Sequence, residues 1–386
     1  MFNILTLNKI AKCGLNQLST AKYAITDDAS KDADGVIVRS FAMHDMELPA
    51  SLKAIARAGA GTNNIPIDKC TEKGIVVFNT PGANANAVKE LVLAALLLSS
   101  RKITDGINWA NGLTGDDIAK QVEKGKSAFA GCEIQGKTLG VIGLGAIGIQ
   151  VANAAQHLGM KVIGFDPYLS VDAALRMSSH IQRATSEAEV YENADYITMH
   201  VPLTPETKGK INSDTLATMK DGVKILNFSR GELVNNDDIK KAIADGKVSC
   251  YVVDFPSAET VNQPGIIPTP HLGASTSESE DNCAVMAAQE IADYLENGNI
   301  TNSVNFPNCT LPTGGAGRIT IAHKNVPNMI TKFTNAFAQA GINISDMINK
   351  SKKENAYTII NSDEIVPTEV VDEISAIEGV IKVRVF

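Results

Sequence analysis

The sequence predicts an α/β protein with two doubly wound units and, after them, a small C-terminal βαββαβ domain. Strand-length apolar runs alternate with helical patterns of apolar residues over residues 1–297. A glycine-rich turn at residues 143–148 joins one of these strands to the helix that follows it. Residues 319–385 follow the order strand, helix, strand, strand, helix, strand, which is typical of a ferredoxin-like sandwich.

The first unit is expected to have strands at residues 2–6, 35–39 and 75–78. Residues 52–64 form either a helix or a strand that runs into a glycine-rich loop. Because ligands bind at the carboxyl ends of parallel strands, Arg39, Ser40 and the loop of residues 59–63 are candidates for substrate contact. The alternatives are a surface arginine and a plain turn. A long helix over residues 276–297 could pack back on this unit and make it discontinuous.

The second unit is organised around the glycine turn. Gly143 permits a tight turn, Gly145 lets the backbone approach a pyrophosphate, and Gly148 lets the helix pack close to the strand. The helix is expected to end at Gly159, and a second strand over residues 161–165 leads to Asp166. Asp166 lies 23 residues after Gly143, where a carboxylate can accept from a ribose 2′-OH and would repel a 2′-phosphate. The pattern therefore predicts a Rossmann-like domain that binds NAD rather than NADP.

Four further strands of this unit each end in a polar residue, namely His200, Arg230, Asp254 and His271. Oxidation of a hydroxyl group by NAD needs a base for the proton and a cation for a neighbouring carboxylate. His271 is the expected base, and Glu259 could hydrogen-bond its other ring nitrogen. Arg230 offers a planar cation, and Asp254 could hold the nicotinamide carboxamide. His200 competes with His271 for the role of base, and each of these residues also has a purely structural interpretation.

The composition argues against several classes of function. The 386 residues are 44% hydrophobic and 20% charged, with a net charge of −8 and no basic block, so neither nucleic acid nor an anionic membrane is an expected partner. The six cysteines show no CxxC spacing, which favours reduced thiols in the cytoplasm and no metal site. The apolar segment 91–98 is too short to span a membrane, and we expect it to be buried, as in a subunit interface.

Expected domain borders follow from these patterns. Residues 1–100 and 274–305 would form a substrate-binding domain, and residues 101–273 the NAD-binding domain, with Trp109 in a core position. Residues 306–316 contain prolines and a glycine pair and would form a linker. Residues 317–386 would then be a separate small domain.

Several motifs occur in the order and spacing of a known family. The chain resembles the D-2-hydroxyacid dehydrogenases, and among them most closely the phosphoglycerate dehydrogenases. The matching stretches are residues 38–40, 57–63, 78–82, 136–148, 200–203, 227–231, 253–259 and 270–276. The resemblance implies NAD-dependent oxidation of 3-phospho-D-glycerate (3-phosphoglycerate) to 3-phosphohydroxypyruvate, the first step of L-serine biosynthesis. It also implies a homodimer or homotetramer.

The resemblance also implies roles for individual residues. It implies Arg230, Glu259 and His271 as the catalytic set, and it moves His200 to a structural or cofactor-side position. The implied NAD contacts are Gly143, Gly145, Ala146, Ile147, Gly148, Asp166, Pro202, Ser229, Asp254 and Gly273. The implied substrate contacts are Arg39, Ser40, Gly59, Ala60, Gly61, Asn84 and Arg230. Ala146 departs from the family pattern, which often has an arginine there that touches the pyrophosphate.

The last domain resembles the regulatory ACT domain that is fused to many phosphoglycerate dehydrogenases. His323, Asn325 and Asn343 match positions that hold the effector L-serine between two subunits in serine-inhibited relatives. Asn328 stands after Pro327 where the usual ACT pattern has glycine. Two other interpretations of the function of the whole chain stay open. The substrate could be another D-2-hydroxy acid, such as glycerate or a sugar-acid phosphate, or the chain could be an NAD-sensing binding protein.

Overall fold

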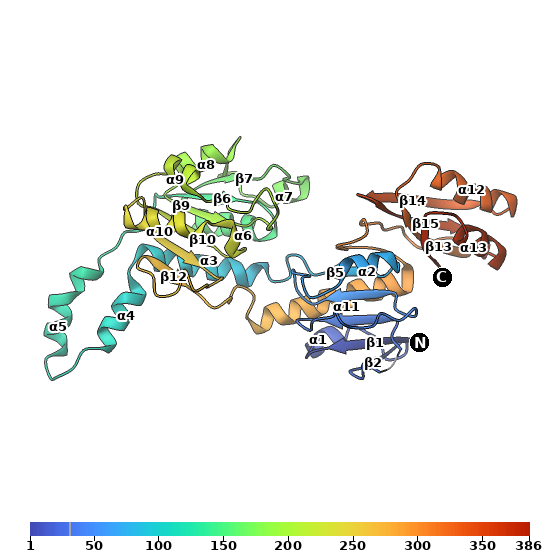
Figure 1. Cartoon of the computed structure of the whole chain (residues 1–386), viewed down its shortest axis with the longest axis horizontal. Helices are drawn as coiled ribbons and strands as arrows, with labels where there is room; N and C mark the ends of the chain where they lie inside the picture. Colours follow the sequence, from blue (N-terminus) through green and yellow to red (C-terminus); the bar gives the residue numbers. More distant parts are fainter. Residues whose placement is uncertain (31) are drawn as a thin grey trace. The chain divides into compact units, whose positions relative to one another are not determined.

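The computed structural model describes residues 1–30 and 32–386, which divide into two compact units. Unit 1 comprises Met1–Asn84 and Ser277–Phe386, and unit 2 comprises Ala85–Thr276. The predicted α/β class is confirmed, with a parallel sheet in each unit and an additional antiparallel sheet in unit 1 (Figure 1). The helix α3 (Ala85–Ser100) belongs to unit 2, whereas the expected border lay after residue 100.

The first sheet of unit 1 has five strands in the order β2-β1-β3-β4-β5, and every neighbouring pair is parallel. Its strands are β1 (Phe2–Leu7), β2 (Tyr23–Thr26), β3 (Gly35–Val38), β4 (Ala54–Arg57) and β5 (Val76–Asn79). Within the ambiguous stretch 52–64, residues 54–57 thus form a strand, because their apolar side chains fill an interior position of the sheet that is buried on both faces. The accompanying short helices are α1 (Lys12–Leu15) and α2 (Ile67–Glu72).

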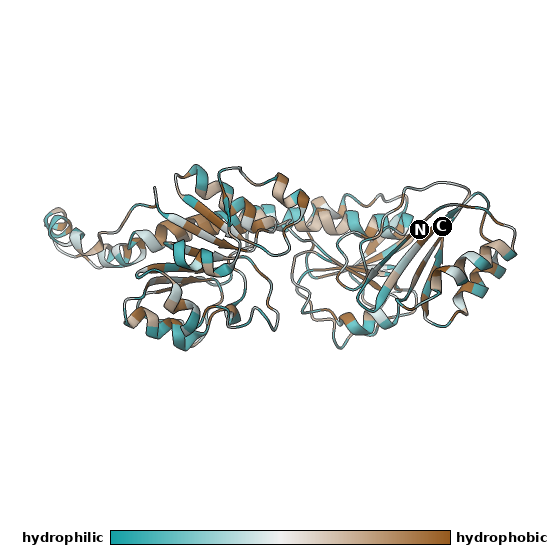
Figure 2. Cartoon of the chain, turned by 90° about the horizontal axis from the view of Figure 1, so that it is seen from above, coloured by the Kyte–Doolittle hydropathy of each residue, from teal (hydrophilic) through white to brown (hydrophobic). Residues whose placement is uncertain are grey.

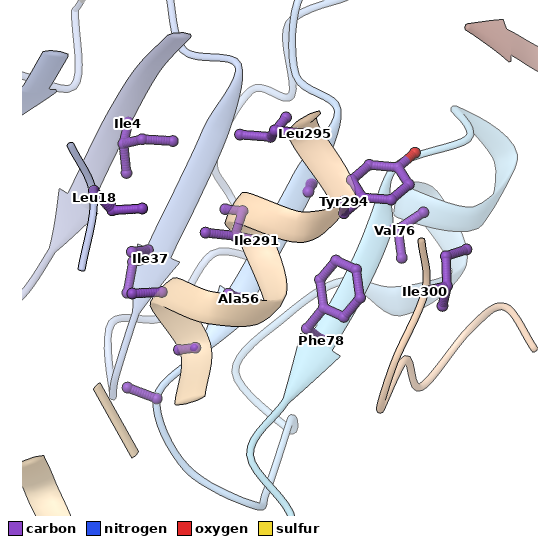
Figure 3. Close-up of a cluster of buried hydrophobic side chains, with 14 of the residues drawn as sticks. Ile4, Leu18, Ile37, Ala56, Val76, Phe78, Ile291, Tyr294, Leu295 and Ile300 are labelled. Carbon is purple, nitrogen blue, oxygen red and sulfur yellow. The ribbon is translucent and has the colours of Figure 1, made fainter. Parts of the chain in front are cut away.

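Helix α11 (Ser277–Asn297) returns from unit 2 and covers one face of this sheet. Figure 3 shows Ile291, Tyr294 and Leu295 of α11 facing Ile37, Val76 and Phe78 of the strands. The rings of Phe78 and Tyr294 lie 5.7 Å apart. Removal of these side chains from water is the main force that attaches α11 to the sheet, because a parallel sheet must be covered on its faces.

The remainder of unit 1 is an α+β sandwich with the predicted βαββαβ order. Its antiparallel sheet has the strand order β14-β15-β13-β16, with two helices that pack against each other. The elements are β13 (Gly317–Lys324), α12 (Met329–Gln339), β14 (Ile344–Lys352), β15 (Asn355–Ser362), α13 (Thr368–Ser375) and β16 (Val380–Val385). The core beneath the helices includes Ile319, Phe333 and Ile360.

Unit 2 is built on a seven-stranded parallel sheet of order β12-β11-β10-β9-β6-β7-β8. The order reverses between β6 and β9, where open α/β sheets bind ligands. The strands are β6 (Thr138–Ile142), β7 (Lys161–Phe165), β8 (Gln182–Arg183), β9 (Tyr196–Met199), β10 (Val223–Asn227), β11 (Val248–Val253) and β12 (Ile266–Pro268). Figure 2 shows these strands mainly in hydrophobic colours, which agrees with their burial.

Helices cover this sheet and connect its strands. Besides α3 they are α6 (Ala146–His157), α7 (Val171–Leu175), α8 (Glu187–Asn193), α9 (Ser213–Thr218), α10 (Asn236–Ala244) and the 3-10 helix η2 (Gly231–Leu233). The prediction that residues 91–98 are buried holds for one face of α3 only. Val92, Ala95 and Leu96 are buried in the core, whereas Leu97 is 46% exposed.

The segment between α3 and β6 contains α4 (Ile103–Asn111), α5 (Ile118–Gly125) and the 3-10 helix η1 (Lys126–Phe129). Neither α4 nor α5 buries a residue fully. The expectation of a core position for Trp109 is wrong, because its ring is half-buried and packs on Phe129 at 5.2 Å. The period of the apolar residues indicated these helices, but it could not show that they lie outside the core.

Candidate active site

The glycine turn between β6 and α6 has the geometry that its sequence predicted. Gly143 has a φ of 91°, and a Cβ atom there would lie 2.5 Å from the carbonyl oxygen of His200. A Cβ atom on Gly148 would lie 1.9 Å from the carbonyl oxygen of Gly143, so the helix can approach the turn only without a side chain there. A Cβ atom on Gly145 would meet nothing within 4 Å. The structure therefore explains Gly143 and Gly148 by packing and leaves open space at Gly145.

Helix α6 begins directly after Gly145, which makes no side-chain capping bond. Its first residues are Ala146, Ile147 and Gly148, so backbone N–H groups of the first turn are directed toward the glycine turn. Such an N-terminus favours a negatively charged group through its free donors and its dipole. The turn and the helix together can hold a pyrophosphate.

Asp166 directly follows β7, beside the glycine turn. Its carboxylate accepts hydrogen bonds from the backbone N–H groups of Leu144 at 2.9 Å and Tyr168 at 2.8 Å. Each carboxylate oxygen has a further lone pair, so the fixed carboxylate can still accept from a hydroxyl group. This geometry fits the predicted recognition of a ribose.

His200 lies at the end of β9, and its ring nitrogens are buried. Nε2 is 3.0 Å from the hydroxyl group of Thr198, and Nδ1 has no hydrogen-bond partner in the described part of the chain. Burial lowers the pKa of His200 to about 4, so the ring is neutral at pH 7. Pro202 and Ser229 follow the neighbouring strands, and Ser229 donates to the carbonyl of Met199 at 2.7 Å. These residues therefore lie along the carboxyl edge of the sheet.

Asp254 is 1% exposed and accepts hydrogen bonds from three groups of one short segment. They are the hydroxyl of Thr269 at 2.7 Å and the backbone N–H groups of Leu272 and Gly273, each at 2.8 Å. His271 lies within this segment and has a φ of 55°, in the left-handed region. Asp254, which the sequence assigned to the cofactor, thus anchors the segment that holds His271.

Phe255 contacts two of the predicted catalytic residues. Its ring centre is 4.6 Å from that of His271, and the guanidinium carbon of Arg230 lies 5.8 Å from the ring. Arg230 also donates to the carbonyl of Ser229 at 2.7 Å, and its own carbonyl accepts from Asn227 at 2.8 Å. An imidazole and a guanidinium on one aromatic ring form a compact base and cation pair. Sequence reasoning missed Phe255, although it directly follows Asp254.

Glu259 does not contact His271 through a hydrogen bond anywhere in residues 1–30 and 32–386. Its carboxylate accepts from the side-chain amide of Asn236 at 2.6 Å. Asn236 begins α10, directly after the capping residue Asn235. The expected bond between Glu259 and His271 is therefore replaced here by one to Asn236, a residue that the sequence analysis did not single out.

The predicted substrate residues of unit 1 gather at the carboxyl edge of its parallel sheet. Arg39 and Ser40 follow β3, and the loop of Gly59, Ala60 and Gly61 follows β4. The side-chain amide of Asn79 donates to the carbonyl of Ala60 at 2.6 Å. Gly59 has a φ of 146°, and a Cβ atom there would lie 1.8 Å from the guanidinium of Arg57. Asn84 is the last residue of the first segment of unit 1.

The predicted effector residues lie at two ends of the antiparallel sheet. His323 is 2% exposed, and its ring nitrogens lie 2.8 Å from the carbonyl of Lys324 and 2.9 Å from the hydroxyl of Thr358. Asn325 donates to the carbonyl of Lys353 at 3.1 Å. Asn343 precedes β14 at the opposite end and donates to Asp363 at 2.6 Å. One copy of the chain therefore does not bring the three residues together.

Among residues 1–30 and 32–386, no helix combines the length and the apolar character that a membrane crossing requires. The same residues contain no cluster of three or more His, Cys, Asp or Glu side chains that could hold a metal ion.

Comparisons with known proteins agree with this geometry. Residues 93–273 match the family model described as D-isomer specific 2-hydroxyacid dehydrogenase, NAD binding domain. The D-3-phosphoglycerate dehydrogenase of Haemophilus influenzae is 30% identical over 401 residues, which cover 98% of this chain and 94% of that protein. The chain belongs to the D-isomer-specific 2-hydroxyacid dehydrogenase family.

Two further relatives of this family member are informative. The D-3-phosphoglycerate dehydrogenase of Bacillus subtilis is 33% identical over 327 residues, which cover 80% of this chain but only 60% of that protein. The solved structure of an NAD⁺-bound 3-phosphoglycerate dehydrogenase from Entamoeba histolytica matches with a TM-score of 0.60 and 27% identity. That match covers 79% of this chain and 98% of the other.

NAD is the cofactor of this family member. The residues present fit the dinucleotide on three independent grounds, which are the open space at Gly145, the uncapped start of α6, and the fixed carboxylate of Asp166. Ala146 offers no cation at the first position of α6. The donors that this turn offers to a pyrophosphate are therefore backbone N–H groups.

Proposed function

We propose that this protein oxidises 3-phospho-D-glycerate to 3-phosphohydroxypyruvate with NAD, the first step of L-serine biosynthesis. The observation that carries the proposal is that Arg230 and His271 both lie against the ring of Phe255, at the carboxyl edge of the NAD-binding sheet. A cation and a base with a common aromatic neighbour suit a substrate with a carboxylate next to the hydroxyl group that is oxidised. Relatives that carry the name D-3-phosphoglycerate dehydrogenase support the choice of substrate.

Each catalytic residue has a separate task in this proposal. Arg230 binds the substrate carboxylate through its planar fork and thereby orients the neighbouring carbon. His271 removes the proton of the hydroxyl group. Glu259 turns from Asn236 to the imidazolium that forms and stabilises its charge. NAD, when bound, supplies the acceptor for the hydride.

Several residues of unit 1 are also candidates for binding an anionic group of the substrate. The guanidinium of Arg39, the hydroxyl of Ser40 and Asn84 are proposed to bind its anionic end. The loop of Gly59, Ala60 and Gly61 offers backbone N–H groups for the same purpose. Asn79 supports this loop through its bond to the carbonyl of Ala60.

The C-terminal sheet is proposed to bind L-serine as a feedback effector. His323 and Asn325 lie at one end of the sheet and Asn343 at the other, so a site that uses all three residues needs two copies of the chain. A homodimer or homotetramer is the assembly that this arrangement favours. We place the enzyme in the cytoplasm, with support from its six unpaired cysteines.

The second candidate is an unphosphorylated D-2-hydroxy acid such as glycerate, which would leave the ion pair between Arg39 and Glu280 undisturbed. The test is NADH formation from NAD with 3-phosphoglycerate and, separately, with D-glycerate, each with and without L-serine. Turnover of the phosphorylated acid alone supports the proposal, and suppression by serine supports the effector site. Turnover of glycerate alone would establish the second candidate, and turnover of neither acid would refute both.

The role of Arg230 can be tested in the same assay. Arg230→Lys retains the charge but not the planar fork, so we expect it mainly to raise KM for the hydroxy acid. An unchanged KM would remove Arg230 from carboxylate binding.

A further inference from the structure

The guanidinium of Arg39 already forms an ion pair with an acidic side chain of the same unit. Its Nη2 donates to Oε1 of Glu280 at 2.6 Å, and Glu280 belongs to the first turn of α11. The two side chains are 41% and 43% exposed, so both can be reached from solvent. One of the cations that should bind the anionic end of the substrate is thus neutralised within the protein.

The space around this ion pair has little room for an anion. A cavity of about 20 Å³ is lined by Arg39 and Glu280 together with Lys9, Ala58 and Ala284. This volume corresponds to about one water molecule and is too small for a phosphate group. An anion that binds to Arg39 and Lys9 within this cavity must therefore displace the carboxylate of Glu280.

Only side chains need to move for this exchange. The backbone of Arg39 is fixed, since its carbonyl accepts from Nε of Arg57 at 3.0 Å. The following backbone N–H groups of Ser40 and Phe41 donate to Oδ1 of Asn8 at 3.0 and 2.5 Å. The guanidinium can therefore exchange one anionic partner for another while its anchor stays in place.

We propose that Glu280 is a specificity-determining residue that competes with the anionic end of the substrate for Arg39. An exposed ion pair is weak, so a phosphate dianion with two oxygens for the guanidinium can displace it. A substrate whose end is uncharged cannot replace the carboxylate of Glu280, so the ion pair between Arg39 and Glu280 stays intact. Because of Glu280, the substrate can bind to Arg39 only if it carries a strongly anionic group such as a phosphate. The identity of the substrate rests on the proposed function, but the competition for Arg39 does not.

The first test compares the wild-type enzyme with Glu280→Gln. Glutamine retains an oxygen that can accept from Arg39 and removes the competing charge. We expect KM for 3-phosphoglycerate to fall about two- to fivefold, the factor that an exposed ion pair represents, while KM for NAD stays unchanged. Glu278→Gln is the matched control, because Glu278 is an exposed acid of the same helical turn and should leave both constants unchanged. An unchanged or raised KM in Glu280→Gln would overturn the proposal.

A binding measurement separates this inference from the proposed function. Inorganic phosphate is titrated into the full chain by calorimetry for the wild type, for Glu280→Gln and for Arg39→Gln/Glu280→Gln. We expect about two- to fivefold tighter binding in Glu280→Gln, and no such gain when Arg39 is also replaced. Equal phosphate affinity in the wild type and Glu280→Gln would refute the competition. If the wild type binds phosphate as expected but does not oxidise 3-phosphoglycerate, the proposed substrate is wrong and the role of Glu280 stands.

Discussion

The carboxylate of Asp254 accepts a hydrogen bond from the backbone N–H of Leu272 at 2.8 Å, directly after His271. Two further groups of the same segment, the hydroxyl of Thr269 and the backbone N–H of Gly273, also donate hydrogen bonds to this carboxylate. The backbone of His271 has a left-handed φ, and the residues on both sides of it are held in place by these hydrogen bonds to Asp254. A buried charge at the end of β11 sets the position of the proposed catalytic base.

Replacement of Asp254 tests this anchor. Asp254→Asn places an amide group opposite donors that need an acceptor, so we expect a loss of about 1–3 kcal/mol in the free energy of unfolding and a lower kcat. Urea unfolding and steady-state kinetics measure the two effects. The control is Asp221→Asn, because Asp221 is 89% exposed and pairs with Lys247 at the surface. A stability change as small as in the control would contradict the anchoring role.

The proposed base can be removed without a change in the fold. His271→Ala should lower kcat by a factor on the order of 10² or more, because general-base catalysis contributes that much. NAD affinity, measured by titration of the protein, should stay near the wild-type value. His157→Ala serves as the control, since His157 is exposed at the end of α6. Near wild-type turnover in His271→Ala would reject His271 as the base.

Two glycines of the same turn should respond differently to alanine. Gly145→Ala places a methyl group in open space at a φ of −79°, so it should leave the free energy of unfolding nearly unchanged and weaken NAD binding. Gly148→Ala places a methyl group 1.9 Å from the carbonyl oxygen of Gly143, so it should destabilise the fold as well. Thermal unfolding measures the stability of both variants, and titration with NAD measures their affinity for the cofactor. Equal stability loss in the two variants would contradict the assignment.

Glu290 of α11 predicts a dependence of stability on pH. The residue is 7% exposed, its Oε1 accepts from Asn302 at 2.7 Å, and burial raises its pKa from 4.5 to about 8. Between these two values the unfolded chain releases a proton that the native protein keeps, so the contribution of Glu290 to stability falls as the pH rises from 4.5 to 8. Below this window the carboxyl group is protonated in both states, and above it the loss is complete.

The variant Glu290→Gln removes this titration. Relative to the wild type, it should gain stability steadily between pH 5 and pH 8. Urea unfolding at both pH values measures the difference, and Glu278→Gln at an exposed site of the same helix shows the background. A constant difference between Glu290→Gln and the wild type across this range would disprove the assignment.

The geometry of the glycine turn could be predicted from the sequence because its determinants are local. Gly143, Gly145 and Gly148 lie within one turn, and their conformational freedom is a property of each residue itself. Asp166 follows after one helix and one strand, so the βαβ connection fixes its place. The strands and helices of both units were likewise predictable where apolar residues recur with a clear period.

The partners of the proposed catalytic side chains could not be predicted in this way. Glu259 was expected to bond to His271, but Asn236 of another element is its partner. The three hydrogen-bond donors to Asp254 come from Thr269, Leu272 and Gly273, and the sequence did not indicate these contacts. Trp109 has the large apolar side chain of a typical core residue, but it lies on α4, which buries none of its residues fully.

By itself, the sequence determined the fold class, the cofactor and the residue types available for chemistry, because these depend on local backbone preferences and on the period of apolar residues. Only the tertiary structure decided that Arg230 and His271 both lie near the ring of Phe255, and that Arg39 is paired with Glu280, 241 residues away in the chain. Such pairings depend on how strands and helices pack. Packing is set by the burial of whole faces rather than by any single residue, so it does not appear in a local pattern.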